Sequence, residues 1–313
     1  MLLLIQYTLV FASVLSLVAL GGCFSEHSGV INLGLEGIMV MGALGGGLAL
    51  NLMPDTTNAF IIVIATILCA SLVGLVYSCL LGVAAINFKA DQTLIGTAMN
   101  MLATAFSVVV VRAKNTAANP NNVSNDLAYI NTKQALIVRI GSFEFSWFML
   151  VAVIALLLSA FVLYRTRFGL RLMACGENPQ AADSVGINVY KMRWAGVLIS
   201  GVLGGLGGIV YVTAGVSSWD FANGVAGYGF LALAVMIFGQ WKPKNIAMAA
   251  LLFGFFRALS YVYTGISWLA ALNIPSTVYI MLPYIISLIV LAFTSKNSRA
   301  PKAEGNPYDK GQR

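Results

Sequence analysis

The chain has 313 residues, of which 59% are hydrophobic and only 9% are charged, and its formal net charge is +7. Its mean hydropathy is +0.87, whereas soluble domains carry about a quarter of their residues as charged side chains. This composition excludes a soluble globular domain and predicts a polytopic membrane protein.

Apolar runs bounded by charges and turn-forming residues predict an all-α membrane fold. A bilayer core about 30 Å thick needs roughly 20 apolar residues per helix, and such runs recur throughout residues 1–295. We predict about nine transmembrane helices, between eight and ten, in a single domain. They lie near residues 2–22, 29–50, 59–87, 92–111, 146–164, 194–213, 225–241, 246–263 and 275–294. The first run lacks the basic start and cleavage site of a secretory signal, so we expect it to remain as a span.

The second predicted span opens with polar residues and glycines, "SGVINLGLEGIMVMGALGGG" at 28–47. Asn32 and Glu36 are four residues apart, so they share one face if this segment is helical. The glycines at 29, 34 and 37 favour a different interpretation, a broken or re-entrant segment. In either case we expect both side chains to face the bundle interior or a wet cavity.

Asn100 and Arg257 lie inside later predicted spans, and the same expectation holds for them. Even on lenient scales a charge at membrane depth costs about 2.5 to 3.5 kcal/mol. For all four polar residues, a hydrogen-bonded clasp between helices is the alternative to a place in a transport path.

Two patterns concern helix packing. Small-xxx-small spacings predict close helix approach at Gly42 with Gly46, at 201 with 205 and at 204 with 208. Gly29–Met41, "GVINLGLEGIMVM", aligns without gaps with Gly224–Met236, "GVAGYGFLALAVM", with five identities in thirteen positions. The two copies run in opposite directions in the predicted topology, as in an inverted repeat. Glycine and valine are common in spans, so chance is the competing explanation.

Two loops are longer than a simple connection needs. The outer loop, 112–145, is rich in asparagine and either meets an arriving ligand or partner or is a solvated spacer. The inner loop, 165–193, contains a helix signal, with Asn178 as N-cap, Pro179 at the first helical position and Gly186 as the stop. The predicted short helix either docks a partner or only ties two spans together.

Basic residues set the orientation, because cytoplasmic loops are enriched in Lys and Arg. With the N-terminus outside, thirteen of the 18 Lys and Arg residues fall on the cytoplasmic side, four fall outside, and Arg257 lies within a span. We therefore predict a multi-pass protein of the bacterial cell membrane with an outside N-terminus and a cytoplasmic C-terminus. The positive charge fits topology and lipid headgroups, and nothing indicates nucleic-acid binding. Residues 296–313 form a basic cytoplasmic tail that we predict to be disordered.

Motifs for chemistry on a substrate are missing from the sequence. It has no "GxxxxGK[ST]" phosphate loop, no "HExxH" and no dinucleotide-binding glycine pattern. The four cysteines have no metal-ligand or disulfide spacing. We predict that the chain is not an enzyme, has no ATPase site and binds no metal.

The motifs resemble those of one family. "SGVINLGLEGIMVMGALGG" resembles a signature of the permease subunits of bacterial ATP-binding-cassette (ABC) importers, in the branched-chain amino acid, ribose and nucleoside group. "GENPQAADSVGINVYKMRWAGVLISGVLGGLGGIVYV" is similar to the cytoplasmic coupling segment and following span of that group. "GVINLGLEGIM" and "GYGFLALAVMIFGQWKP" look most like the nucleoside branch. The late span lacks the "GIAVALLG" wording of the paired permease, which leaves the symmetry of the two halves open.

The resemblance implies a nucleoside importer. The chain would form a heterodimer with a second permease, bind a cytoplasmic ABC ATPase that uses the ATP, and receive purine or pyrimidine nucleosides from an extracytoplasmic lipoprotein. No cofactor is implied for the chain itself. The implied coupling residues are Gly176, Glu177, Asn178, Pro179, Ala181, Ala182 and Gly186. The candidate path residues are Asn32, Glu36, Asn100, Trp219, Tyr228 and Arg257.

Other interpretations stay open. The substrate of such a permease could be a sugar such as ribose or a branched-chain amino acid, although an amino acid would require charged partners for its termini. A stand-alone secondary transporter would require ionisable residues in several spans, and only Glu36 and Arg257 qualify. A membrane enzyme would require a metal cluster or a paired nucleophile.

Overall fold

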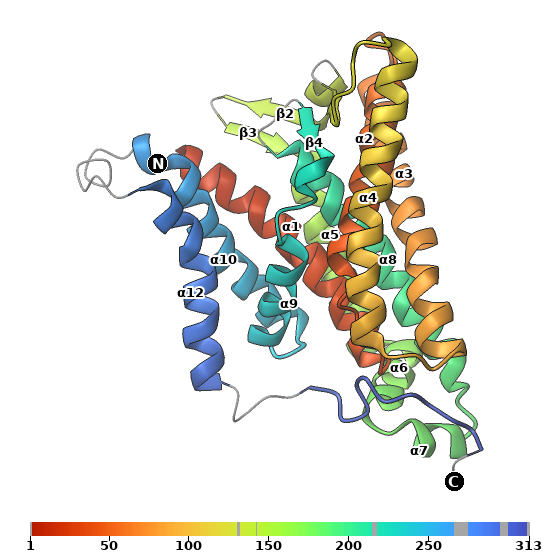
Figure 1. The fold of residues 1–313 in the computed structure, drawn as a ribbon. Coiled ribbons are helices and arrows are strands. Elements are labelled where there is room, and N and C mark those ends of the chain that lie inside the picture. The colour runs from red at the N-terminus through yellow and green to blue at the C-terminus, as the bar shows by residue number, and fades with distance from the viewer. Residues whose placement is uncertain are drawn as a thin grey trace.

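The computed structural model describes residues 2–129, 132–141, 143–214, 218–265, 275–294 and 300–311. Figure 1 shows a helical bundle with the hairpin β2–β3 at one end and the short helices α6 and α7 at the other. The N-terminus lies towards the hairpin end, and the C-terminus lies beside α7. The helices are α1 Leu2–His27, α2 Leu35–Leu52, α3 Ala59–Gly82, α4 Gln92–Ala118, α5 Trp147–Arg165, α6 Arg167–Glu177, α7 Pro179–Ser184, α8 Val189–Thr213, α9 Tyr228–Phe238, α10 Pro243–Val262 and α12 Ser276–Thr294.

Polar caps fix where several helices begin. The Asp91 carboxylate accepts hydrogen bonds from the N–H groups of Thr93 and Leu94, at 2.8 and 2.9 Å, at the start of α4. Asn58, Ser146 and Thr166 cap α3, α5 and α6 in the same way. These side chains satisfy N–H groups that have no partner within the helix, so these four helices each start at a polar residue.

The nine predicted spans each coincide with a helix, but they are not equivalent. Within the described residues, seven helices are long and apolar enough to cross a membrane: α1, α2, α3 with its π-helical continuation Val83–Asn87, α4, α5, α8 and α10 with its continuation to Gly265. The prediction of a full helical span at 225–241 was wrong, because α9 has 11 residues and reaches only about 16 Å at 1.5 Å per residue. The all-α membrane fold is confirmed, and a count of nine crossings is not.

Helix α8 forms the centre of the bundle and packs against α1, α2 and α3. A Cβ atom at Gly42 of α2 would overlap the backbone of Gly205, and one at Gly208 would overlap the carbonyl of Met39. Both glycines belong to the predicted small-xxx-small pairs. The prediction of close helix approach at these positions is therefore confirmed.

Short strands cover the hairpin end of the bundle (Figure 1). β1 Asp126–Ala128 pairs antiparallel with β4 Ser218–Asp220, so the long loop after α4 is tied to the segment after α8. β2 Ile137–Ile140 and β3 Phe143–Ser146 form an antiparallel hairpin directly before α5. The loop after α4 is thus partly ordered by strand pairing.

The tail differs from its prediction. Disorder was expected for 296–313, but the described part, 300–311, packs against the bundle with Tyr308 only 5% exposed. Its backbone donates a hydrogen bond from Ala303 N–H to the carbonyl of Gly176, at 2.8 Å. Composition predicted a solvated tail because the segment is polar, and it could not reveal a docking surface elsewhere in the fold. Residues 295–299, 312 and 313 lie outside the described part.

Candidate functional site

The α1–α2 linker, residues 28–34, is not helical. Its backbone turns at Gly29, whose φ of +91° lies in the region that favours glycine. Ser25 holds the turn, because its hydroxyl donates to the Val30 carbonyl at 2.8 Å and its own carbonyl accepts from Val30 N–H at 3.2 Å. Of the two interpretations of this segment, the broken one is correct.

Asn32 lies in this linker, so the prediction that it shares a helix face with Glu36 was wrong. Helix α2 begins only at Leu35, and the two side chains contact different elements. The Asn32 Nδ2 group donates to the hydroxyl of Ser200 on α8 at 2.8 Å. Its Oδ1 atom is buried and has no hydrogen-bond partner among the described residues. Asn32 therefore keeps one acceptor available inside the bundle.

Asn100 of α4 holds the other end of the linker. Its Nδ2 group donates to the carbonyl of Leu33 at 2.9 Å, and its Oδ1 atom accepts from Gly37 N–H at 2.8 Å. One amide thus pairs with a carbonyl before α2 and with an N–H of its first turn. Such backbone groups have no water partner at membrane depth, so the clasp meets a direct physical need.

Glu36 connects α2 to the start of α9. Its two carboxylate oxygens accept from Gly227 N–H at 2.8 Å and from Gly229 N–H at 2.6 Å. A carboxylate at a helix N-terminus is favoured by both hydrogen bonding and the helix dipole. Gly227 and Gly229 belong to the second copy of the internal sequence echo, so the two echoed segments are in contact. In this conformation Glu36 is a helix clasp.

An aromatic cluster continues from Tyr228, the first residue of α9, which is 1% exposed. The Tyr211 ring lies 4.1 Å from it, centroid to centroid. The Arg257 guanidinium carbon lies 5.3 Å from the ring centroids of both Tyr228 and Tyr261. Cations over aromatic faces are stabilised without a formal ion pair. The Tyr228 hydroxyl is buried and has no hydrogen-bond partner among the described residues.

Trp219 joins the same cluster from β4. Its ring packs edge-on against Tyr211 at 5.3 Å, and its Nε1 group donates to the Gly224 carbonyl at 2.9 Å. Four of the six candidate path residues, Glu36, Trp219, Tyr228 and Arg257, thus form one connected group. Asn32 and Asn100 lie at the α1–α2 linker. Tyr211 and Tyr261 were not predicted as site residues, because they lie in apolar runs that carry no local signal for a binding site.

The short helix predicted in the inner loop is present as α7. Asn178 is its N-cap and accepts from Ala181 N–H at 3.0 Å, Pro179 is its first residue, and Gly186 follows it with a φ of +83°. The prediction of a capped short helix in this loop is therefore confirmed.

The seven predicted coupling residues separate into two groups by exposure. Glu177, Asn178, Ala181 and Gly186 are exposed and Pro179 is half-buried, whereas Gly176 and Ala182 are buried. Ala182 packs with Cys175 and Tyr308, and a Cβ at Gly176 would overlap the carbonyl of His27. Because the Ala182 side chain is buried against the protein and the Gly176 backbone packs on His27, neither residue offers a surface to an external partner in this conformation. The exposed Val185, which the sequence analysis missed, extends from the end of α7 at 75% exposure.

The described residues around α7 carry no reactive centre. Burial raises the pKa of the Cys175 thiol to about 11, so this cysteine stays protonated at neutral pH and packs as a small hydrophobe. Among the residues that the structure describes, no three His, Cys, Asp or Glu side chains come together as a metal site would require. The arrangement offers hydrogen-bonding amides, aromatic rings and a helix on the surface.

Comparison with known proteins places these features in context. Residues 4–292 match the family described as branched-chain amino acid transport system / permease component. The chain is 40% identical over 308 residues to the nucleoside ABC transporter permease protein NupC of Lactococcus lactis subsp. cremoris (strain MG1363), covering 97% of this chain and 96% of that protein. It is 40% identical over 317 residues to the guanosine ABC transporter permease protein NupQ of Bacillus subtilis (strain 168), covering 99% and 97%.

A more distant relative comes from the same Lactococcus strain. The nucleoside ABC transporter permease protein NupB is 26% identical over 258 residues, covering 76% of this chain and 67% of that protein. These matches confirm the family resemblance that the motifs indicated.

The Glu36 clasp leads to a stability prediction. Glu36→Gln keeps the size of the side chain but places an amide donor where one N–H is bound, so we expect the free energy of unfolding to fall by about 1–3 kcal/mol. Thermal unfolding in detergent measures the change. The matched control is Glu144→Gln, which alters an ion pair with Arg139 whose side chains are 37% and 78% exposed and a 3.4 Å hydrogen bond from Gln6, and should cost under about 1 kcal/mol. Equal, small effects of both variants would contradict the clasp.

Proposed function

Because the chain belongs to the permease family of branched-chain amino acid transport systems, we propose that it forms half of the membrane path of an ABC importer whose substrates are nucleosides. The observation that carries the substrate proposal is its 40% identity, over nearly the whole of each chain, to permeases named for nucleosides and guanosine. A sugar such as ribose and a branched-chain amino acid are the alternatives that the test below must separate.

The chemistry of the candidate path residues and of the neighbouring Tyr211 supports a neutral, flat substrate. A nucleoside presents ribose hydroxyls, ring nitrogens and an aromatic face, and a site for it combines a few polar groups with aromatic walls. The Oδ1 atom of Asn32 and the Tyr228 hydroxyl are buried and have no hydrogen-bond partner among the described residues, so a conformational opening that exposes them would offer both polar atoms to a ligand. Tyr211 and Trp219 supply aromatic surface nearby. The charge of Glu36 is taken up by two backbone N–H groups, so it offers little to an amino acid's ammonium group.

The proposed orientation places the N-terminus outside and α7 in the cytoplasm. Its support is the distribution of basic residues together with the positions of the two termini, which lie at opposite ends of the bundle (Figure 1). The loops near the hairpin β2–β3 would then meet a substrate-binding protein outside, and α7 would meet the ATPase inside.

An ABC permease works with an ATPase and a substrate-binding protein, and we propose a second, different permease as the other half of the path. Two permeases named for nucleosides in one Lactococcus strain, NupC and NupB, both resemble this chain, which supports a heterodimer. ATP would be bound and hydrolysed only by the ATPase, and the chain itself would hold no cofactor. Closure of the ATPase would move α7 and change which side of the membrane the path opens to.

Uptake in cells tests the substrate. In a strain that lacks this gene, restoring the chain should restore uptake of radiolabelled nucleosides such as guanosine. Unlabelled adenosine or uridine in excess should compete, and ribose and leucine should not, because neither carries a base to stack on the aromatic cluster. If only ribose competed, a sugar would replace nucleosides as the proposed substrate. If only leucine competed, a branched-chain amino acid would replace them.

The exposed end of α7 tests the docking proposal. Val185→Asp replaces an apolar side chain that is 75% exposed with a charged one. We therefore expect the ATPase to be lost on co-purification, while the amount of permease in the membrane stays unchanged. Val123→Asp is the matched control, since Val123 is also exposed, at 63%, but lies in the loop after α4. Normal ATPase recovery with Val185→Asp would exclude this end of α7 from the docking surface.

A further inference from the structure

The C-terminal segment Pro301–Gly311, hereafter the strap, crosses the α7 end of the bundle beneath several helices (Figure 1). Its backbone N–H groups bind two separate elements. Ala303 N–H donates to the Gly176 carbonyl of α6 at 2.8 Å, and Gly305 N–H donates to the Gly29 carbonyl at 3.3 Å. The strap therefore joins the segment that leads into α7 to the turn in the α1–α2 linker.

Tyr308 anchors the strap beside α7. Its side chain packs with Cys175, Ala182 and Val189 in a small apolar cluster. Its ring meets that of Tyr190 edge-on at 5.3 Å, and its carbonyl accepts from the Tyr190 hydroxyl at 3.4 Å. Ala182 lies on the buried face of α7 and packs with Tyr308. A movement of α7 must therefore displace Tyr308 or carry it along.

A buried arginine connects the strap to the linker. Arg193 of α8 is 1% exposed, and its Nη2 group donates to the Asn306 carbonyl at 2.9 Å. Its guanidinium carbon lies 6.0 Å from the Tyr308 ring centroid. A Cβ at Gly29 would lie 3.0 Å from the Arg193 Nη2 atom, so the linker turn packs directly on this cation. A buried charge is costly unless it has hydrogen-bond partners. The need to partner Arg193 therefore holds the strap and the linker turn around the same guanidinium group.

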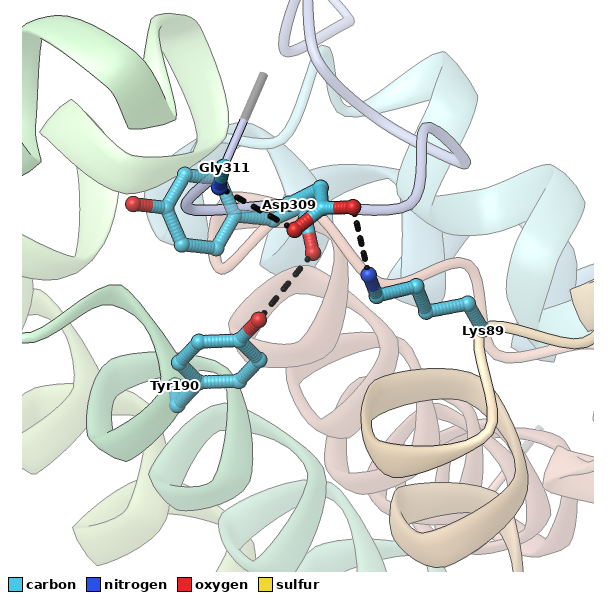
Figure 2. Close-up of polar contacts among 5 residues, drawn as sticks. Lys89, Tyr190, Asp309 and Gly311 are labelled. Carbon is cyan, nitrogen blue, oxygen red and sulfur yellow. Dashed lines mark hydrogen bonds and ion pairs between the residues drawn. The ribbon is translucent and has the colours of Figure 1, made fainter. Parts of the chain in front are cut away.

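The burial of Glu304 and an ion pair at Asp309 are two further features expected of a strap that is packed against the bundle. Burial raises the pKa of Glu304 to about 7, so this carboxyl stays protonated over a range in which a free glutamate is ionised. Lys89, in the turn before α4, pairs with Asp309 at 2.8 Å (Figure 2). Both side chains of that pair are more than one-third exposed, so it contributes little compared with Tyr308 and Arg193.

We propose that the strap is a positioning segment that transmits the movement of α7 to the α1–α2 linker, and hence to Asn32. This inference rests on the proposed function, because it assumes that the ATPase moves α7. Packed side chains and hydrogen bonds carry coupling between sites when they join elements that move. The strap meets that condition, since Tyr308 contacts α7 and Gly305 contacts the linker at Gly29. Gly29 lies three residues before Asn32. Beside the contact between Tyr308 and α7 lies a groove of about 250 Å³, lined by residues 177–180 on one side and by strap residues on the other.

The test measures nucleoside imported per ATP hydrolysed in proteoliposomes that contain both permeases, the ATPase and the binding protein. Tyr308→Ala should lower this ratio on the order of tenfold while the complex still assembles. Tyr308→Phe should restore the ratio, because the ring contacts with Tyr190 and Arg193 are retained. Lys310→Ala is the matched control, an exposed residue of the same segment, and should leave the ratio unchanged.

The outcomes separate the strap from the proposed function. Absence of nucleoside uptake by the unaltered complex would contradict the proposed function. Normal uptake together with an unchanged ratio in Tyr308→Ala would overturn the strap alone.

Hydrogen exchange on the unaltered complex decides the question if Tyr308→Ala does not assemble. The amides of Ala303 and Gly305 should be protected without nucleotide, and their protection should change when a non-hydrolysable ATP analogue traps the ATPase. Equal protection in both states, or exchange at the rate of an unstructured peptide, would overturn the strap.

Discussion

The structure depends on how the α1–α2 linker satisfies its backbone inside the bundle. At membrane depth an irregular segment is tolerated only where protein groups replace the water it would otherwise bind. Asn100 supplies both a donor and an acceptor to the linker and the first turn of α2, and Ser25 closes the turn at Gly29. The break therefore exists because particular side chains from α1 and α4 hold it.

The same linker is where the other elements meet. Asn32 binds α8 through Ser200, Glu36 binds the start of α9, and Gly29 accepts a hydrogen bond from the strap. In the proposed strap mechanism, a displacement at the α7 end would reach this linker through the contact between Gly305 and Gly29. The sequence presents a clasp and a transport path as alternatives for each polar residue. At Asn32 the amide nitrogen is bound to Ser200, and the Oδ1 atom is buried with no partner among the described residues, so the contacts are compatible with both proposed roles.

Local signals were predictable from the sequence, and tertiary contacts were not. The cap at Asn178, the stop at Gly186 and the glycine-rich break before α2 depend on neighbouring residues, so the pattern was sufficient. The burial of Ala182, the ordering of the tail and the position of Arg193 depend on surfaces brought together from distant parts of the chain. Arg193 falls at the end of the inner loop 165–193 in the sequence-based topology, whereas in the structure it is buried and contacts the strap and the turn at Gly29, both far from it in the chain. The prediction that Asn32 and Glu36 share a helix face was wrong, because it applied helical spacing across the break before α2.

The most direct test of this account is to remove the amide of Asn100 while keeping its approximate size. In Asn100→Leu the Leu33 carbonyl and the Gly37 N–H both lose their partner inside the bundle. The account predicts that the free energy of unfolding falls by about 1–3 kcal/mol, measured by thermal unfolding, and that nucleoside uptake falls with it. Wild-type stability and wild-type uptake in Asn100→Leu would contradict the claim that side chains hold the broken linker.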